Sequence, residues 1–245
     1  MKEQNIITAA ITYSGDNVSM HGFIAYRKDQ TGKRPGILVI PEWWGLTEYI
    51  KRRAKMLAEL GYIAMAVDIY GDGKVVDTPT EAGQLAKQFY DDLDMTKRRF
   101  DAAVQTIKTY AETDTQQLAA IGYCFGGTQA MNMACMGEDL KAVVSFHGGL
   151  TVAATDSNKL KAPILVCHGG ADPFVPEAEV NQFKKEMADA NADLTFISYE
   201  GATHAFSNPE ITAVGEKFDI PLRYNEAADK GSWQAMQDFF KKYLH

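Results

Sequence analysis

The 245-residue sequence has little cysteine, no long apolar run and no excess of basic residues. Its three cysteines, Cys124, Cys135 and Cys167, have neither paired spacing nor the spacing of metal ligands. Cys135 is predicted on a helix and Cys167 inside a strand, so both are interpreted as packing residues. No apolar stretch approaches the roughly 20 residues that cross a bilayer. These absences argue against a disulfide framework, a metal site and a membrane anchor.

The charge balance argues against a further class of protein. There are 25 basic and 32 acidic residues, a net charge of −7, which is opposite to the basic footprint of nucleic-acid-binding proteins. Two short basic clusters, residues 51–53 and 97–99, are interpreted as solvated helix faces. Residues 1–5 lead into a short mixed run and lack a signal peptide's apolar core. We therefore expect a cytoplasmic protein without a nucleic-acid or membrane partner; the sequence does not specify an oligomeric state.

Short apolar runs alternate with helical patterns along the chain. Residues 6–13 and 18–26 are predicted to be strands joined by a turn, which makes a hairpin. Further strands are predicted at residues 36–40, 62–68, 119–123, 142–146, 164–167 and 194–199. Helices are predicted between Thr47 and Gly61, twice within 80–111, at 128–136, at 176–190 and around Trp233–Tyr243. This order predicts an α/β fold whose mostly parallel sheet is covered on both faces. Without a repeat, linker or composition break, residues 1–245 are predicted to form one domain.

The hexapeptide Gly-Tyr-Cys-Phe-Gly-Gly at residues 122–127 separates a predicted strand from a predicted helix. This pattern is typical of the nucleophile elbow of α/β-hydrolases, with Cys124 where serine is usual. A Cβ atom at Gly122 or Gly126 would collide with neighbouring backbone in so tight a turn, while Cys124 would project alone. The positive end of the helix dipole would favour a thiolate there. The alternative is a buried core cysteine in a glycine-rich turn.

Two further polar residues, Asp172 and His204, each follow a predicted strand. Ligands of such sheets bind beyond the carboxyl ends of the strands. The order of nucleophile, acid and histidine is that of the α/β-hydrolases. We therefore predict that His204 takes the thiol proton and later protonates the leaving oxygen. Asp172 would hold the imidazole in its working tautomer.

Each of these residues also has a structural interpretation. The pair Asp172-Pro173 commonly initiates a turn, and a histidine after a strand is often a hydrogen-bonded loop residue. His147 and His168 follow strands as well and compete with His204 for the role of base. His147 precedes the acid and so breaks the required order. His168 lies too close to Asp172 in sequence to come from a separate final loop.

Acyl chemistry also needs hydrogen-bond donors for the oxyanion. The backbone N–H of Phe125, directly after the nucleophile, is predicted to be one donor, and the loop after the third strand supplies another. That loop contains Trp43. The contribution comes from the main chain, so the residue type at this position is not informative.

Four segments together resemble the dienelactone hydrolase family. They are Pro-Glu-Trp-Trp-Gly at 41–45, the elbow at 122–127, Gly-Gly-Ala-Asp at 169–172 and Gly-Ala-Thr-His-Ala-Phe at 201–206. The resemblance extends over nearly the whole chain. It implies a single-domain α/β-hydrolase fold and a cofactor-free, metal-free hydrolase of ester or lactone bonds that uses Cys124, His204 and Asp172. In the family, a glutamate that matches Glu42 contacts the resting thiol and takes part in its activation. Without the resemblance, Glu42 would be interpreted as a polar loop residue.

The chain departs from this family in the residues that bind the substrate. Dienelactone enzymes hold a substrate carboxylate with two arginines, one in the helix after the fourth strand and one four positions after the catalytic histidine. Here residues 80–90 contain no arginine, and the second position is Asn208. The resemblance therefore transfers the fold and the nucleophile but not the substrate. Aromatic residues on loops expected to line the pocket favour apolar groups, although each could be core packing: Trp43, Trp44, Phe125 and Phe206.

The predicted function is therefore hydrolysis of carboxylic esters or lactones through an acyl-enzyme on Cys124. A thioesterase or acyl transferase with the same triad is an alternative, because the sequence does not show the leaving group. A second alternative is a non-catalytic protein of this fold that binds a small ligand and carries Cys124 as a redox-sensitive thiol. The presence of all three polar residues in the required order favours catalysis.

Overall fold

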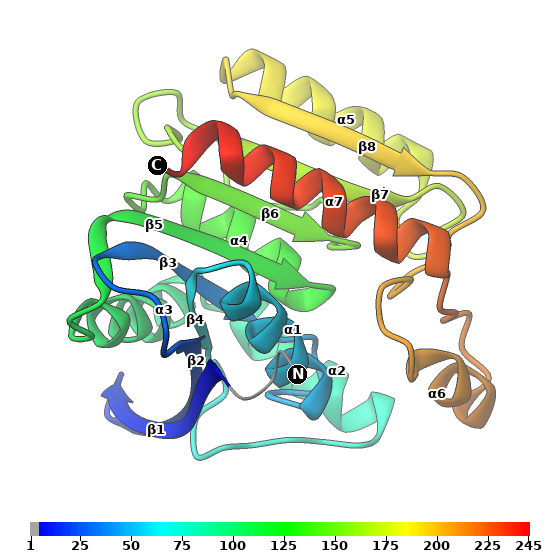
Figure 1. Cartoon of the computed structure of the whole chain (residues 1–245). Coiled ribbons are helices and arrows are strands. Elements are labelled where there is room, and N and C mark those ends of the chain that lie inside the picture. The colour runs from blue at the N-terminus through cyan, green and yellow to red at the C-terminus, as the bar shows by residue number, and fades with distance from the viewer. Residues whose placement is uncertain (1–4) are drawn as a thin grey trace. The chain divides into compact units, whose positions relative to one another are not determined.

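The structure is a computed structural model that describes residues 5–245. Residues 1–4, on which the expected lack of a signal peptide partly depends, lie outside the described residues. The strands are β1 (Ile6–Gly15), β2 (Val18–Arg27), β3 (Arg34–Ile40), β4 (Ile63–Ala66), β5 (Thr113–Tyr123), β6 (Ala142–Phe146), β7 (Ile164–Gly169) and β8 (Leu194–Tyr199). The helices are α1 (Glu48–Glu59), α2 (Pro79–Asp91), α3 (Leu93–Lys108), α4 (Phe125–Cys135), α5 (Glu177–Asp189), α6 (Ile211–Phe218) and α7 (Glu226–Tyr243) (Figure 1).

The predicted fold class is confirmed. The strands have the order β1-β2-β4-β3-β5-β6-β7-β8. β1 and β2 form the predicted antiparallel hairpin, and β2 pairs antiparallel with β4. β3 pairs with β4, β6 with β7, and β7 with β8 in parallel. The hairpin turn is only two residues long because Asp16 and Asn17 adopt φ values of 53° and 61°, as tight hairpin turns require.

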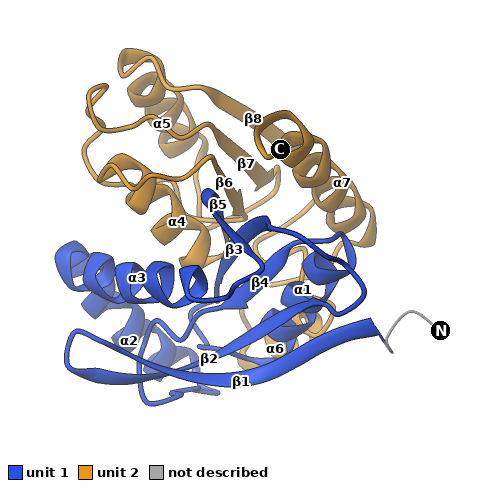
Figure 2. Cartoon of the chain, turned by 60° about the vertical axis from the view of Figure 1, so that its left-hand side comes forward, with its two compact units in different colours: residues 1–120 blue, residues 121–245 orange. Residues whose placement is uncertain are grey.

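The chain divides into two compact units, residues 1–120 and residues 121–245 (Figure 2). Strand β5 begins in the first unit and ends in the second. Within the first unit, α1 packs on β2 and β4, and α3 packs on β1 and β3 from the opposite side (Figure 2). That the whole of residues 1–245 behaves as one domain stays a prediction, and a single cooperative unfolding transition would be its signature.

Strands β6 and β7 of the second unit are buried on both faces. Every residue of β6 and β7 is buried, with α7 in front of β6 and α4 behind it (Figure 1). All of α4 is buried too, which makes it a rigid support for the residue that precedes it. Burial raises the pKa of Cys135 to about 11 and that of Cys167 to about 12, so both thiols stay protonated and unreactive. This agrees with their interpretation as packing residues.

Some sequence expectations are wrong in detail. Helix α6 was not predicted, because it is short and carries Gly215, a poor helix former; Ile211 and Val214 nonetheless pack against Leu222. Pro176 occupies the N-cap of α5 rather than its first turn. Within residues 5–245, no helix combines the length and the apolar character that crossing a membrane requires.

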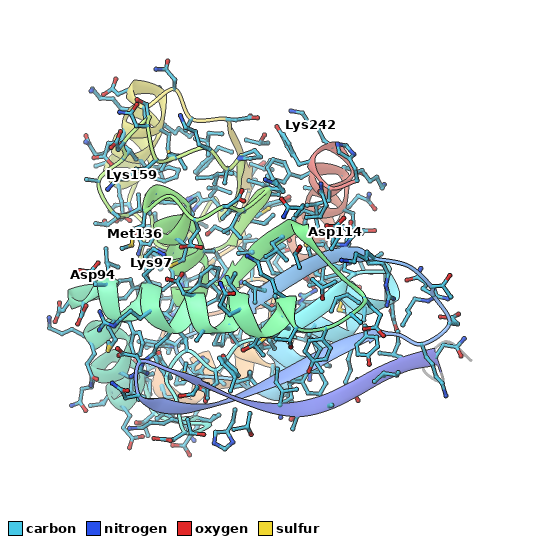
Figure 3. All side chains as sticks on the ribbon, turned by 90° about the vertical axis from the view of Figure 1, so that its left-hand side faces the viewer. Asp94, Lys97, Asp114, Met136, Lys159 and Lys242 are labelled. Carbon is cyan, nitrogen blue, oxygen red and sulfur yellow. The ribbon has the colours of Figure 1, made fainter. Side chains whose placement is uncertain are left out.

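The sequence suggested that both basic clusters are solvated, but one arginine of each cluster is buried. Arg53 is buried on α1, and Arg99 is buried on α3, where its guanidinium donates to the carbonyls of Ile69 and Tyr70. Lys97 does face outward (Figure 3), and its ammonium pairs with Asp101 on the same helix. An arginine on a helix can be buried when carbonyl oxygens accept hydrogen bonds from its guanidinium. A sequence pattern does not reveal where those carbonyl oxygens lie.

Candidate active site

Cys124 is the single residue between the end of β5 and the start of α4. Its φ of 54° and ψ of −120° are strained for a residue with a side chain. A Cβ atom added to Gly122 would lie 1.9 Å from the carbonyl oxygen of Gly126, far closer than non-bonded atoms approach. The structure thus contains the predicted strand–turn–helix, with glycine sterically required at position 122.

A histidine supports the backbone of this turn. The N–H of Cys124 points at two acceptors, the Phe146 carbonyl at 2.9 Å and Nδ1 of His147 at 3.1 Å. Since Nδ1 of His147 accepts, its proton resides on Nε2, which lies 2.7 Å from the Ser207 hydroxyl. His147 is fully buried. Its polar atoms therefore hold the turn, which disfavours the alternative that it acts as the general base.

The three predicted triad residues come together within the second unit. Nε2 of His204 lies 3.0 Å from the sulfur of Cys124, and Nδ1 of His204 lies 2.7 Å from Oδ2 of Asp172. Asp172 follows β7 and His204 follows β8, as Cys124 follows β5. All three therefore lie beyond the carboxyl ends of strands, where α/β sheets bind ligands. The side chain of Asp172 is inaccessible to solvent, and that of His204 is 11% exposed.

Asp172 satisfies both interpretations that the sequence allowed. One carboxylate oxygen, Oδ1, accepts a hydrogen bond of 2.9 Å from the N–H of Phe174, as a turn-initiating aspartate does. The other oxygen, Oδ2, faces the imidazole of His204. The turn thereby fixes the carboxylate in the orientation in which it accepts a hydrogen bond from the Nδ1–H group of His204.

The electrostatics of the site favour a protonated imidazole. Burial by itself would lower the pKa of His204. Negative charge on the sulfur of Cys124 and the hydrogen bond to Asp172 outweigh burial and raise this pKa from 6.5 to about 10. The charges on either side of the imidazole therefore favour its protonated form.

Phe125 occupies the first position of α4, so its N–H projects from the positive end of the helix. Glu42 and Trp43 lie in the first unit, on the loop that follows β3. Glu42 is 1% exposed, and its carbonyl accepts from Gly45. The Trp43 carbonyl accepts a hydrogen bond of 2.9 Å from the Tyr70 hydroxyl. Oxyanion donation by Phe125 and Trp43 and thiol activation by Glu42 stay predictions.

His168, the other rival for the role of base, borders a different cavity. Together with Asp172, Lys184 and Phe196 it lines a cleft of about 290 Å³ between β7, β8 and α5. Neither Cys124 nor His204 lines this cleft. Burial lowers the pKa of His168, which keeps the imidazole neutral. Because His168 borders a cleft that Cys124 does not line, His204 is favoured as the partner of the thiol.

Phe174 is a residue of the site that the sequence interpretation missed. Its ring centroid lies 5.3 Å from that of His204, with the two planes at 79°. Half of the phenylalanine is exposed. The sequence contained one signal for this residue: a large apolar side chain directly follows Asp172-Pro173, in a turn where polar residues are usual. In residues 5–245, no group of three or more His, Cys, Asp or Glu side chains is arranged to hold a metal ion.

Comparisons with known proteins agree with this architecture. The sequence model of the dienelactone hydrolase family matches residues 20–244. The chain belongs to the dienelactone hydrolase family. The "Putative carboxymethylenebutenolidase" of Aquifex aeolicus is 31% identical over 239 residues, which cover 96% of this chain and 98% of that protein. Like its family, the protein is a hydrolase of the ester and lactone type, as the sequence motifs predicted.

Two solved structures of the family superimpose on nearly the entire chain. A dienelactone hydrolase-like promiscuous phosphotriesterase from metagenomic libraries has a TM-score of 0.91 and 30% identity, and the match covers 98% of this chain and 100% of that one. A dienelactone hydrolase homologue from Klebsiella pneumoniae has a TM-score of 0.80 and 26% identity, covering 97% and 99%. The family relationship therefore includes both compact units of the chain.

Proposed function

We propose that this member of the dienelactone hydrolase family cleaves carboxylic ester or lactone bonds through an acyl-enzyme on Cys124. The observation that carries the proposal is the chain of hydrogen bonds from Cys124 through His204 to Asp172. A thiol, an imidazole and a carboxylate in this geometry can activate the nucleophile and deliver a proton to the leaving group.

In the acylation step, the sulfur of Cys124 attacks the carbonyl carbon and a carbon–sulfur bond forms. The N–H of Phe125 stabilises the oxyanion, with the N–H of Trp43 as the second donor. The carbon–oxygen bond of the ester then breaks, and the imidazolium of His204 protonates the departing oxygen. Asp172 holds the imidazole in place and stabilises its charged form.

In the deacylation step, the neutral imidazole of His204 removes a proton from water, which attacks the thioester carbon. The carbon–sulfur bond breaks, the acid leaves, and the proton returns to the Cys124–His204 pair. A thioesterase would share this second step, whereas an acyl transferase would replace water by another acceptor. The ester and lactone reaction is preferred because the family is named for a lactone hydrolase.

The first prediction concerns the pH dependence of acylation. The pKa of His204 is raised to about 10, so the imidazolium persists at neutral pH and is lost as the pH rises through that value. For an alkyl ester, whose leaving oxygen needs a proton, kcat/KM should fall above about pH 10. A 4-nitrophenyl ester of the same acid should show a weaker fall, since its leaving group departs without protonation.

Initial rates of the two esters between pH 6 and 11 test this prediction. Rates with Cys124→Ala supply the background at each pH, and circular dichroism verifies that the protein remains folded. A profile for the alkyl ester that stays flat through pH 11, or one that falls equally for both esters, would show that His204 is not the proton donor.

The second prediction concerns the charge of the substrate. The arginines elsewhere in the chain that could replace the family's carboxylate clamp are Arg52, Arg53, Arg98, Arg99 and Arg223. Arg98 pairs with Asp16, and Arg99 donates to backbone carbonyls. A buried carboxylate without a cationic partner carries a desolvation cost of up to several kcal/mol. We therefore expect a neutral 4-nitrophenyl ester to have a kcat/KM at least about tenfold above that of its analogue with a free carboxylate.

Arg223 provides the matched control for this comparison. It is exposed and follows Leu222, which pairs with His204 in a β-bridge. A preference for the carboxylated ester that disappears in Arg223→Gln would overturn the prediction and identify Arg223 as the clamp. A neutral aryl phosphotriester is a useful third substrate, because one relative is described as a phosphotriesterase.

A further inference from the structure

Phe174 presents an apolar surface to solvent beside the polar triad. The residue is 50% exposed although burial of a phenylalanine side chain is strongly favourable in water. The large apolar side chains that share this degree of exposure in residues 5–245 are Leu60, Val75 and Tyr90, all in the first unit. Phe174, by contrast, lies in the second unit against the imidazole of His204. The exposed surface of Phe174 is therefore available to a molecule that approaches the triad.

The local structure holds Phe174 in this position. Its N–H donates to Oδ1 of Asp172, and the other oxygen of that carboxylate binds Nδ1 of His204. The ring therefore belongs to the same rigid turn as the acid. The preceding residue, Pro173, further restricts the backbone of this turn.

The chemistry of the proposed reaction determines which part of a substrate reaches this ring. For His204 to protonate the leaving oxygen, that oxygen must come within about 3 Å of Nε2. The first carbon atoms of the alcohol group must then lie beside the imidazole. The ring of Phe174 is centred 5.3 Å from the imidazole centroid, within the reach of such a group.

We propose that Phe174 binds the alcohol portion of the ester and makes the enzyme selective for aromatic or bulky apolar alcohols. This inference rests on the proposed acyl-enzyme function. During acylation the sulfur–carbon bond forms, the carbon–oxygen bond breaks and the alcohol leaves with a proton from His204. The alcohol contacts Phe174 up to that point and is absent from the acyl-enzyme.

This sequence of steps separates substrate binding from a merely structural role. Loss of an alcohol contact slows acylation in proportion to the size of the alcohol and leaves deacylation unchanged. Displacement of His204 or Asp172 slows both steps, because the same imidazole acts in both.

The experiment compares benzyl and methyl esters of one acid, whose leaving groups both need protonation. The ratio of kcat/KM for benzyl over methyl ester should fall about tenfold in Phe174→Ala, since the contact with the ring is lost. Phe174→Leu should restore part of the ratio, and Leu60→Ala, an exposed apolar control in the first unit, should leave it unchanged. The decay of isolated acyl-enzyme, followed by mass spectrometry, should keep its wild-type rate.

Three results would overturn the inference. Equal losses of kcat/KM for both esters in Phe174→Ala, or slower decay of its acyl-enzyme, would assign the residue a structural role. Unchanged kcat/KM for both esters would place the alcohol elsewhere. Failure of the proposed function is distinguishable from all three, because the wild-type enzyme would then form no acyl-enzyme on Cys124 with either ester.

Discussion

Cys124→Ala is expected to lower the hydrolysis of a neutral aryl ester by about 10⁴-fold or more, in line with the removal of other triad nucleophiles. The sulfur is the one atom of the Cys124 side chain in hydrogen-bond distance of Nε2 of His204. Alanine keeps the Cβ atom and the N–H that bonds to Phe146 and His147, so the elbow and α4 should remain intact. Steady-state rates measure the loss of hydrolysis, and circular dichroism measures whether the fold is retained.

Cys135→Ala is the matched control. Cys135 ends the same helix and is buried, and its raised pKa excludes a thiolate at neutral pH. This variant should lose stability through the cavity but retain kcat per folded molecule. Hydrolysis by Cys124→Ala at close to the wild-type rate would mean that Cys124 is not the nucleophile.

Asp172→Asn is expected to lower kcat by about 10³- to 10⁴-fold, the scale known for the acid of serine-protease triads. An amide at this position can present N–H to Nδ1 of His204 and so stabilise the tautomer that cannot accept from the thiol. It also removes a hydrogen bond and a charge that raise the pKa of His204. The fall of kcat/KM at alkaline pH should therefore move to lower pH.

Glu177→Gln tests whether any nearby carboxylate would have the same effect. Glu177 is an exposed residue in the first turn of α5, shortly after the Asp172 turn. Its replacement should leave both kcat and the alkaline pH dependence unchanged. If Asp172→Asn retained more than a tenth of the wild-type kcat with the same pH profile, Asp172 would be a turn residue without a catalytic role.

The sequence predicts which strands carry the residues of this site, because the end of a strand can be recognised from the residues around it. Runs of mostly apolar residues at 142–146 and 194–199, both predicted to be strands, coincide with β6 and β8. Cys124 and His204 follow such runs, and their order along the chain suffices to propose a triad. β5 begins earlier than predicted, since its first residues include Asp114, Gln116 and Gln117, which lack an apolar pattern.

Other features depend on contacts between residues that are far apart in sequence. The bond from the Cys124 N–H to His147 spans 23 residues, and that from His147 to Ser207 spans 60. Sequence patterns reveal periodic burial but not such pairs, so His147 could only be placed as a rival base. The exposed ring of Phe174 was missed for a similar reason, because exposure in a turn is decided by tertiary packing.

The most direct test of the central claim is to observe the acyl group on Cys124. Wild-type protein is mixed with a 4-nitrophenyl ester of a bulky acid, whose acyl-enzyme decays slowly, and is quenched with acid within milliseconds. Intact-mass spectrometry should show the added mass of one acyl group, and peptide mapping should assign it to Cys124, with no adduct in Cys124→Ala. Continued turnover without an adduct, or an adduct on another residue that forms as fast as the ester is cleaved, would contradict the acyl-cysteine mechanism.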